Sequence, residues 1–223
     1  MGSYGQVLDT LERELQGVSD TFASLSEEEW RKDTLLEPFE PHRPRWTVLE
    51  LAGHMDISIG LTRMLIASQE HGQPGRDQVS FFIFPRSEVA PTVYDYAYTM
   101  VAGKTPADMP RVLGETFAKS ISESRALPPE TVGSGYYALM RLDEFVASRV
   151  VEAVVHGIDL TDATGRECIA TAEGIAITAS ILDELLARRT VAGRPADLGD
   201  DLAWIRAASG RAAHIDPRLP LLG

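Results

Sequence analysis

The sequence predicts an all-α protein, a helical bundle with a C-terminal helical extension. Several long stretches place apolar side chains in alternating steps of three and four, the spacing of one face of an α-helix. Capping residues precede these stretches, and Gly or Pro residues follow them. Alternating patterns typical of strands are few, so the elements below are expected to be helices joined by loops.

The first helix is predicted over residues 7–25. Its apolar side chains lie on a single stripe that can face a core. These side chains are Leu8, Leu11, Leu15, Val18, Phe22 and Leu25.

After this helix, Ser26 followed by Glu27, Glu28 and Glu29 has the pattern of a new helix start, with acids in the first turn. Proline then breaks any helix before Trp46, because its ring clashes with the preceding turn and it lacks a backbone N–H. The prolines are Pro38, Pro41 and Pro44.

A second long helix is predicted to begin at Trp46 or Thr47 and to end near Glu70. Thr47 and Glu50 have the spacing of a capping box, in which each side chain bonds a backbone N–H of the other's turn. The inward-facing series of this helix contains His54 at a place where the pattern expects Leu or Ile. The series is Leu51, His54, Ser58, Leu61 and Leu65.

Residues 71–104 do not predict one structure. The apolar run Phe81–Phe84 lies between Pro and Gly residues and is compatible with a short strand, a lid or the start of an aromatic helix. At Thr105-Pro106 the pattern is that of an N-cap followed by proline in the first turn, which predicts a helix to about Arg125.

The helix predicted over Leu142–Asp162 is apolar on nearly every side, as expected for a helix buried all round. Beyond Gly165, Thr171 is the expected cap of a further helix that continues through Leu185. A shorter helix is predicted over Asp201–Ser209. Residues 171–209 could pack on the bundle or on a second chain, which would make a homodimer.

The charge balance limits the partners. The chain of 223 residues has 33 Asp and Glu against 21 Lys and Arg, a net charge of −12, which repels nucleic acid and anionic lipid. We therefore expect neither nucleic acid nor membrane as a partner. No apolar run spans a bilayer, the N-terminus has no signal-peptide pattern, and the single cysteine, Cys168, makes no intrachain disulfide. These features predict a cytoplasmic protein.

The ionisable side chains that could form a functional site lie mainly in the helix predicted over Leu142–Asp162. In it, Glu152 and His156 are four residues apart on one face. A carboxylate in an apolar helix is costly unless it is paired or binds a metal. With His54 they form a two-histidine, one-glutamate set, which suits zinc or another divalent metal such as nickel. Asp159, one turn further on, could hold a ligand imidazole or act as a general base. Asp159 and Arg149, which lies one turn before Glu152, are the candidate catalytic residues.

A structural interpretation competes with the metal site. Arg149 lies one turn before Glu152 and could form a buried ion pair with it. The polar stripe would then be a salt-bridge network that needs no metal, and spacing alone leaves both interpretations open.

Two motifs carry a resemblance to a known family. Trp46-Thr-Val-Leu-Glu-Leu-Ala-Gly-His54 is followed, about a hundred residues later, by Glu152-x-x-x-His156-Gly-x-Asp159 and the run from Leu160 to Gly165. In this order they resemble the N-terminal domain of mycothiol-dependent maleylpyruvate isomerase and its relatives in the DinB-like superfamily. The resemblance covers residues 5–165 and implies an up-down-down-up four-helix bundle over residues 1–165. Residues 166–223 would be a helical extension packed on that bundle.

The resemblance also implies a function. His54, Glu152 and His156 would bind a divalent metal, and the metal would bind the sulfur of a low-molecular-weight thiol, which is mycothiol in actinobacteria. The thiolate would attack an electrophilic small molecule, giving S-transfer or thiol-assisted isomerisation. The second α/β domain of the isomerase has no counterpart here, so maleylpyruvate itself is not the expected substrate.

Two other functions remain open from sequence. One is a metal-dependent hydrolase or lyase on the same scaffold, in which the open metal position holds hydroxide and no thiol is used. The other is a helical bundle without enzymatic activity that binds a ligand or a partner.

Overall fold

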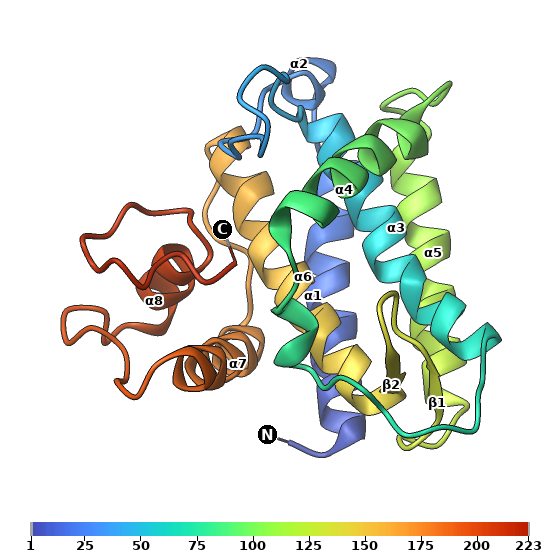
Figure 1. The fold of residues 1–223 in the computed structure, drawn as a ribbon. Coiled ribbons are helices and arrows are strands. Elements are labelled where there is room, and N and C mark those ends of the chain that lie inside the picture. The colour runs from blue at the N-terminus through green and yellow to red at the C-terminus, as the bar shows by residue number, and fades with distance from the viewer. Residues whose placement is uncertain (1, 223) are drawn as a thin grey trace.

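Four long helices run up, down, down and up to form a bundle in the computed structural model, which describes residues 2–222 (Figure 1). The all-α prediction and the direction of each bundle helix are confirmed. The bundle helices are α1 (Tyr4–Ala23), α3 (Val48–Ala67), α5 (Met109–Arg125) and α6 (Leu142–Thr164).

Capping side chains set the starts of α1 and α3. Thr47 and Glu50 form the capping box expected at the start of α3, and Ser3 and Gln6 form an equivalent box that starts α1 before the expected Val7. In both boxes side-chain oxygens accept hydrogen bonds from N–H groups that the helix leaves free. Helix α3 ends at Ala67, short of the expected Glu70.

The crossover between the two parallel helices α3 and α5 contains a 3₁₀ turn, η1 (Ser80–Phe82), and α4 (Arg86–Val101). The sequence did not predict α4, because only Val89, Ala97 and Val101 of this helix are buried and its apolar periodicity is therefore weak. Helix α4 packs along α3 (Figure 1), and residues of α4 line the same pocket as His54.

The expected helix start at Thr105-Pro106 is wrong. Helix α5 begins at Met109, and Pro110 is the proline in its first turn. The Thr105 hydroxyl and backbone N–H both donate to the Asp108 carboxylate, at 2.7 and 2.8 Å, so Thr105 closes a turn before the helix and does not cap it.

Two small elements complete the bundle. Helix α2 (Glu27–Trp30) begins with the Ser26 cap expected from sequence. Strands β1 (Val132–Ser134) and β2 (Leu139–Arg141) form an antiparallel hairpin before α6, which was not predicted, since three-residue strands are too short to show an alternating pattern.

The C-terminal extension contains α7 (Ala172–Arg189) and α8 (Asp201–Ala208). Gly165 ends α6 in the left-handed conformation with φ 71°, and Thr171 caps α7 as expected. Helix α7 packs on α6 and α1, and α8 packs on α7, where it buries Trp204. Bundle and extension therefore share one continuous apolar core.

Among residues 2–222, no helix is both long and apolar enough to cross a membrane.

Gly53 sets the distance between α3 and α4. A Cβ at this position would lie 2.6 Å from the carbonyl oxygen of Ala97 and 2.7 Å from the Val101 side chain. We expect Gly53→Ala to lower the free energy of unfolding by about 1–3 kcal/mol, because α4 must move away from α3. Urea denaturation followed by circular dichroism measures this change.

The matched control is Gly114→Ala, at a glycine within α5 that has nothing near its Cβ position. Alanine there should raise stability by up to about 1 kcal/mol through helix propensity alone. Equal effects of the two substitutions would contradict the close packing of α3 and α4 at Gly53.

Candidate metal centre and pocket

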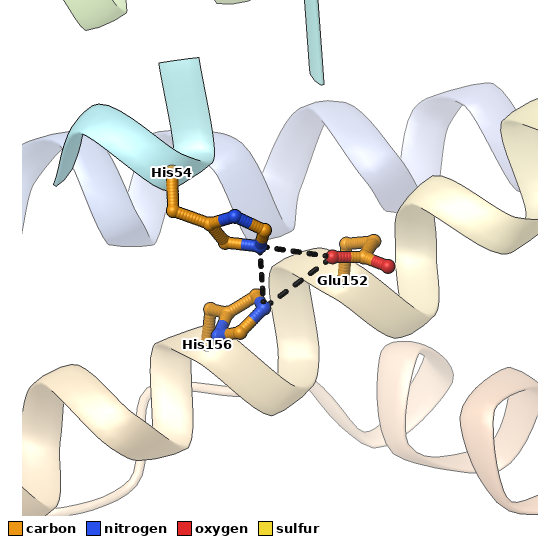
Figure 2. A group of neighbouring side chains, drawn as sticks. All are labelled: His54, Glu152 and His156. Carbon is orange, nitrogen blue, oxygen red and sulfur yellow. Dashed lines mark hydrogen bonds and ion pairs between the residues drawn. The ribbon is translucent and has the colours of Figure 1, made fainter. Parts of the chain in front are cut away.

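Three side chains meet between α3 and α6. His54 comes from the middle of α3, while Glu152 and His156 stand one turn apart on α6, with their donor atoms pointing at one another (Figure 2). The Nε2 atoms of the two histidines are 3.0 Å apart, and the Glu152 Oε2 atom lies 3.5 Å from His54 Nε2 and 3.3 Å from His156 Nε2. The three residues expected from sequence to form one site therefore lie together.

Burial and the charges of neighbouring groups together set the protonation of this site. Burial lowers the pKa of His54, and the neighbouring His156 lowers it further, so His54 is neutral near pH 7. Burial alone would raise the pKa of the Glu152 carboxyl, but the two histidines and Arg149 outweigh it and hold that pKa well below its usual range. Glu152 is therefore a carboxylate in a buried place.

The arrangement fits a divalent cation. The Nδ1–H of His156 donates to a carboxylate oxygen of Asp159 at 2.8 Å, so Nε2 is the ring atom that faces Glu152 and His54. Burial lowers the pKa of His156, but Asp159 and Glu152 outweigh it and raise that pKa, so a bound metal ion would displace the Nε2 proton. Two imidazole Nε2 atoms and one carboxylate oxygen, all within 4.8 Å of one another, would thus face a metal ion at this place. Donors bound to tetrahedral zinc at about 2.0–2.2 Å lie about 3.3–3.6 Å apart, which two of the three spacings here match, while the two Nε2 atoms are closer, at 3.0 Å.

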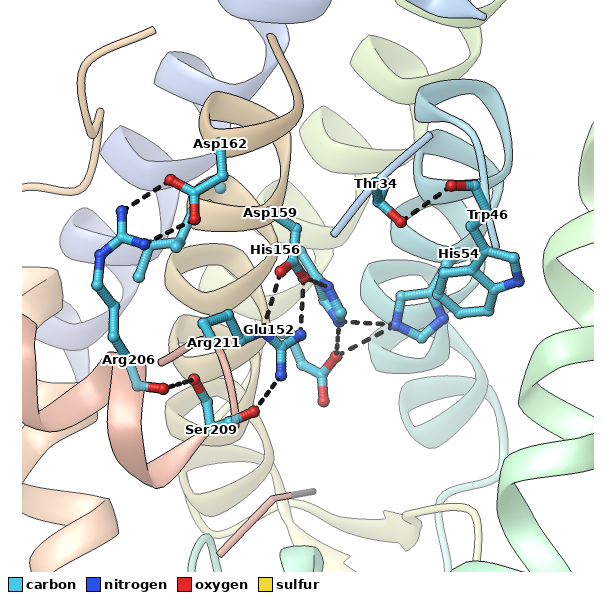
Figure 3. A network of polar contacts seen from close by, with 12 residues as sticks. Thr34, Trp46, His54, Glu152, His156, Asp159, Asp162, Arg206, Ser209 and Arg211 are labelled. Atoms are coloured by element: carbon cyan, nitrogen blue, oxygen red, sulfur yellow. Dashed lines mark hydrogen bonds and ion pairs between the residues drawn. The ribbon is translucent and has the colours of Figure 1, made fainter. Parts of the chain in front are cut away.

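Asp159 holds His156 and is itself held by the extension. Its side chain is 2 % exposed, and Arg211, which follows α8, donates to both of its oxygens, from Nε at 2.9 Å and from Nη2 at 2.7 Å (Figure 3). Burial raises the pKa of the Asp159 carboxyl, but Arg211 and His156 outweigh it and bring that pKa to about 2. A carboxylate with both oxygens engaged and so low a pKa is a poor general base, and the geometry instead favours the role of holding the imidazole.

Sequence reasoning missed Arg211. It lies 52 residues after Asp159, in a segment with no recognisable motif. The only signal that could have indicated it was the need of a buried Asp159 for a cationic partner.

Arg149 lies at the outer limit of ion-pair distance from Glu152, and its closer contacts are hydrogen bonds to serine. Its Nη2 atom is 3.9 Å from Glu152 Oε1, while its Nη1 atom donates to the backbone carbonyl and the hydroxyl of Ser58, both at 2.9 Å. The Ser58 hydroxyl in turn donates to Glu152 Oε2 at 3.1 Å. The Arg149 guanidinium lies over the rings of Phe81 and Phe145, and the residue is 1 % exposed. Through its bonds to Ser58 it orients the hydroxyl that donates to Glu152.

A pocket of about 370 Å³ opens over the candidate metal site. His54, Glu152 and His156 lie in its wall beside Trp46, whose ring centroid is 5.1 Å from that of His54. Its other walls are mainly apolar and come from η1, α4, the hairpin and the C-terminus. The aromatic residues among them are Phe39, Phe81, Phe82, Phe84, Tyr94, Tyr96, Tyr136 and Tyr137.

Comparisons with known proteins agree with the fold. No protein-family model matches the sequence, and no functionally curated protein matches it. Among solved structures, the crystal structure of the mycothiol-dependent maleylpyruvate isomerase is similar, with a TM-score of 0.55 and 12% sequence identity over 83% of this chain and 70% of that one. The two proteins share a fold. This confirms the helical-bundle fold expected from sequence, while identity this low does not establish family membership.

The Asp159–Arg211 pair can be tested through metal affinity. We expect Arg211→Gln to weaken metal binding about 10–100-fold, because Asp159 loses the partner that fixes it against His156. Competition with a chromophoric zinc chelator measures this affinity.

Arg206→Gln is the control. Arg206 donates two hydrogen bonds to Asp162, which lies one turn beyond Asp159 on α6 (Figure 3). The substitution therefore removes a similar contact between extension and bundle without changing a residue of the site. An equal loss of metal affinity in both variants would show that Arg211 acts only by docking the extension.

Proposed function

We propose that this protein is a metal-dependent enzyme that uses a low-molecular-weight thiol, mycothiol, to attack an electrophilic small molecule. The observation that carries the proposal is the convergence of His54, Glu152 and His156 in the wall of a mainly apolar pocket. The fold shared with a mycothiol-dependent isomerase supports the use of a thiol. Addition of the thiolate to an activated double bond gives a thioether, and addition, rotation and elimination give a cis–trans isomer.

His54, Glu152 and His156 would hold the metal, most simply zinc, with nickel also compatible with these ligands. A divalent metal at this place supplies positive charge that favours thiolate over thiol near neutral pH. Three protein ligands leave room for a thiol sulfur on the pocket side.

The surrounding residues prepare the site. Asp159 fixes the His156 ring, and Arg211 fixes Asp159, so neither group needs to reorganise during the reaction. Arg149 holds Ser58 against Glu152, which keeps the carboxylate turned toward the two imidazoles. The apolar walls exclude water from the electrophile and keep it near the attacking sulfur, which raises the effective concentration of the two reactants.

Metal content is the first test. Purified wild-type protein should contain close to one equivalent of zinc or nickel by inductively coupled plasma mass spectrometry, and Glu152→Ala should lose it, because two imidazoles alone hold a divalent ion weakly. Glu115→Ala is the control, since this exposed glutamate on α5 pairs with Arg111 far from the site. Metal-free wild-type protein, even after reconstitution, would refute the metal site and favour a non-enzymatic bundle.

The thiol requirement is the second test. With mycothiol and a panel of electrophiles, wild-type protein should form conjugates or isomers, and His54→Ala and His156→Ala should lose this activity while their far-ultraviolet circular dichroism stays unchanged. Mass spectrometry of the products follows the reaction. Turnover that is independent of added thiol would contradict the proposal and indicate a metal-dependent hydrolase or lyase.

A further inference from the structure

Most arginines of this acidic protein have a carboxylate partner. Of its eighteen arginines, fifteen lie within 4.0 Å of an Asp or Glu side chain. Within residues 2–222, only Arg76, Arg86 and Arg189 have no such partner. With 33 Asp and Glu in the chain, unpaired arginines are an exception that calls for an explanation.

The three exceptions gather around the pocket. Arg86, at the start of α4, and Arg189, at the end of α7, both line it. Arg76 lies over the ring of Tyr137, a pocket residue, at 5.2 Å from the ring centroid. The arginines that lack a carboxylate partner are therefore concentrated at the pocket.

The other charged side chains in the pocket wall do not neutralise Arg86 and Arg189. Among the described residues, Glu37 is bonded to Arg45, and Arg211 to Asp159. Glu152, the remaining acid of the wall, faces the two histidines. Arg86 and Arg189 thus leave a positive charge on the pocket.

Both arginines keep N–H groups free for a ligand. Arg86 lies over the ring of Phe39, at 5.3 Å from the ring centroid, a contact that orients the guanidinium without using its N–H groups. Arg189 donates one bond, from Nη1 to the backbone carbonyl of Leu221 at 2.9 Å. Both residues are exposed, so a ligand in the pocket can reach their N–H groups. Partial desolvation lowers the pKa of both groups, and the charge of Arg211 lowers that of Arg86 further. An anion bound here would relieve this repulsion.

The rest of the pocket is suited to an apolar body. Its volume of about 370 Å³ and its aromatic walls match a ligand with a ring or a comparable hydrocarbon group, which would gain from burial against Phe and Tyr side chains. A ligand that satisfies both the walls and the free arginines carries an apolar body and a carboxylate.

We propose that the electrophile taken by this pocket is an aromatic or similarly apolar organic acid, whose carboxylate is attracted by the positive charge that Arg86 and Arg189 give to the pocket wall. The term electrophile rests on the proposed function, but recognition of the acid requires neither thiol nor turnover. The binding test below can therefore fail or succeed independently of the enzymatic activity.

The test uses a matched pair of unreactive probes, 3-phenylpropanoate and its neutral amide, 3-phenylpropanamide. Their dissociation constants are measured by isothermal titration calorimetry with metal-free protein and again with zinc-loaded protein. Charge-assisted hydrogen bonds are stronger than neutral ones, so the acid should bind wild-type protein at least about tenfold more tightly than the amide in both forms.

The variant Arg86→Gln/Arg189→Gln should lose this preference while its affinity for the amide stays unchanged, which would show that the pocket is intact. The control Arg13→Gln/Arg111→Gln removes the same charge from α1 and α5 and should keep the preference. If the glutamine variant loses both probes, Arg86→Lys/Arg189→Lys decides: a retained preference supports the proposal, and a lost one overturns it.

Three further results would overturn the proposal. The first is equal binding of acid and amide to wild-type protein. The second is a preference for the acid that is lost when the metal is removed but is retained by the zinc-loaded glutamine variant. This result would place the carboxylate on the metal.

The third concerns a carboxylate-bearing thiol used in place of mycothiol, probed with S-methylglutathione, which has carboxylates and no free thiol. If the glutamine variant loses affinity for this probe and keeps affinity for 3-phenylpropanoate, the two arginines recognise the thiol and not the electrophile.

Discussion

The burial of Glu152 between two imidazoles at the interface of α3 and α6 is the constraint around which the rest of the structure is arranged. A carboxylate in an apolar helix interface is unstable without compensation. Here His54 and His156 face it from two helices, and Ser58 donates to it from one side. Arg149, the nearest cation, is held at 3.9 Å by its bonds to Ser58. The protein thus balances part of the negative charge of Glu152, and a metal cation bound here would balance the rest.

This constraint extends outward through Asp159 to the C-terminal extension. His156 keeps its orientation because Asp159 accepts its Nδ1 hydrogen, and Asp159 stays ionised in a buried place because Arg211 binds both of its oxygens. Arg206 and Asp162 make a parallel bond one turn further along α6. Removal of residues 166–223 would therefore uncover the apolar face of α6 and also leave a buried carboxylate without its cation.

The crossover between α3 and α5 supplies the pocket. Gly53, next to His54, lets α4 pack directly on α3, and α4 then carries pocket residues such as Val93 and Tyr94 over the site. Two parallel helices cannot be joined by a short loop, so the fold needs a long connection at this place. The protein uses that connection to build the walls that face the candidate metal centre.

The sequence by itself determined most of the helices and the three candidate ligands. Caps such as Thr47 and Thr171, and apolar periods such as that of α1, depend on interactions within a few residues, so they are visible in the chain. His54, Glu152 and His156 were visible for the same reason, since each interrupts an apolar helical face. The helix start proposed at Thr105 failed because an Asp108 turn competes for the same groups.

Only the tertiary structure decided the position of α4, the partner of Asp159 and the residues that line the pocket. Arg211 meets Asp159 across 52 residues, and Arg86 and Arg189 meet the same pocket from α4 and α7. Contacts of this kind depend on how whole helices pack and leave no periodic trace in the sequence around them. Local patterns therefore identified the helices and the reactive side chains, while long-range packing decided which groups surround them.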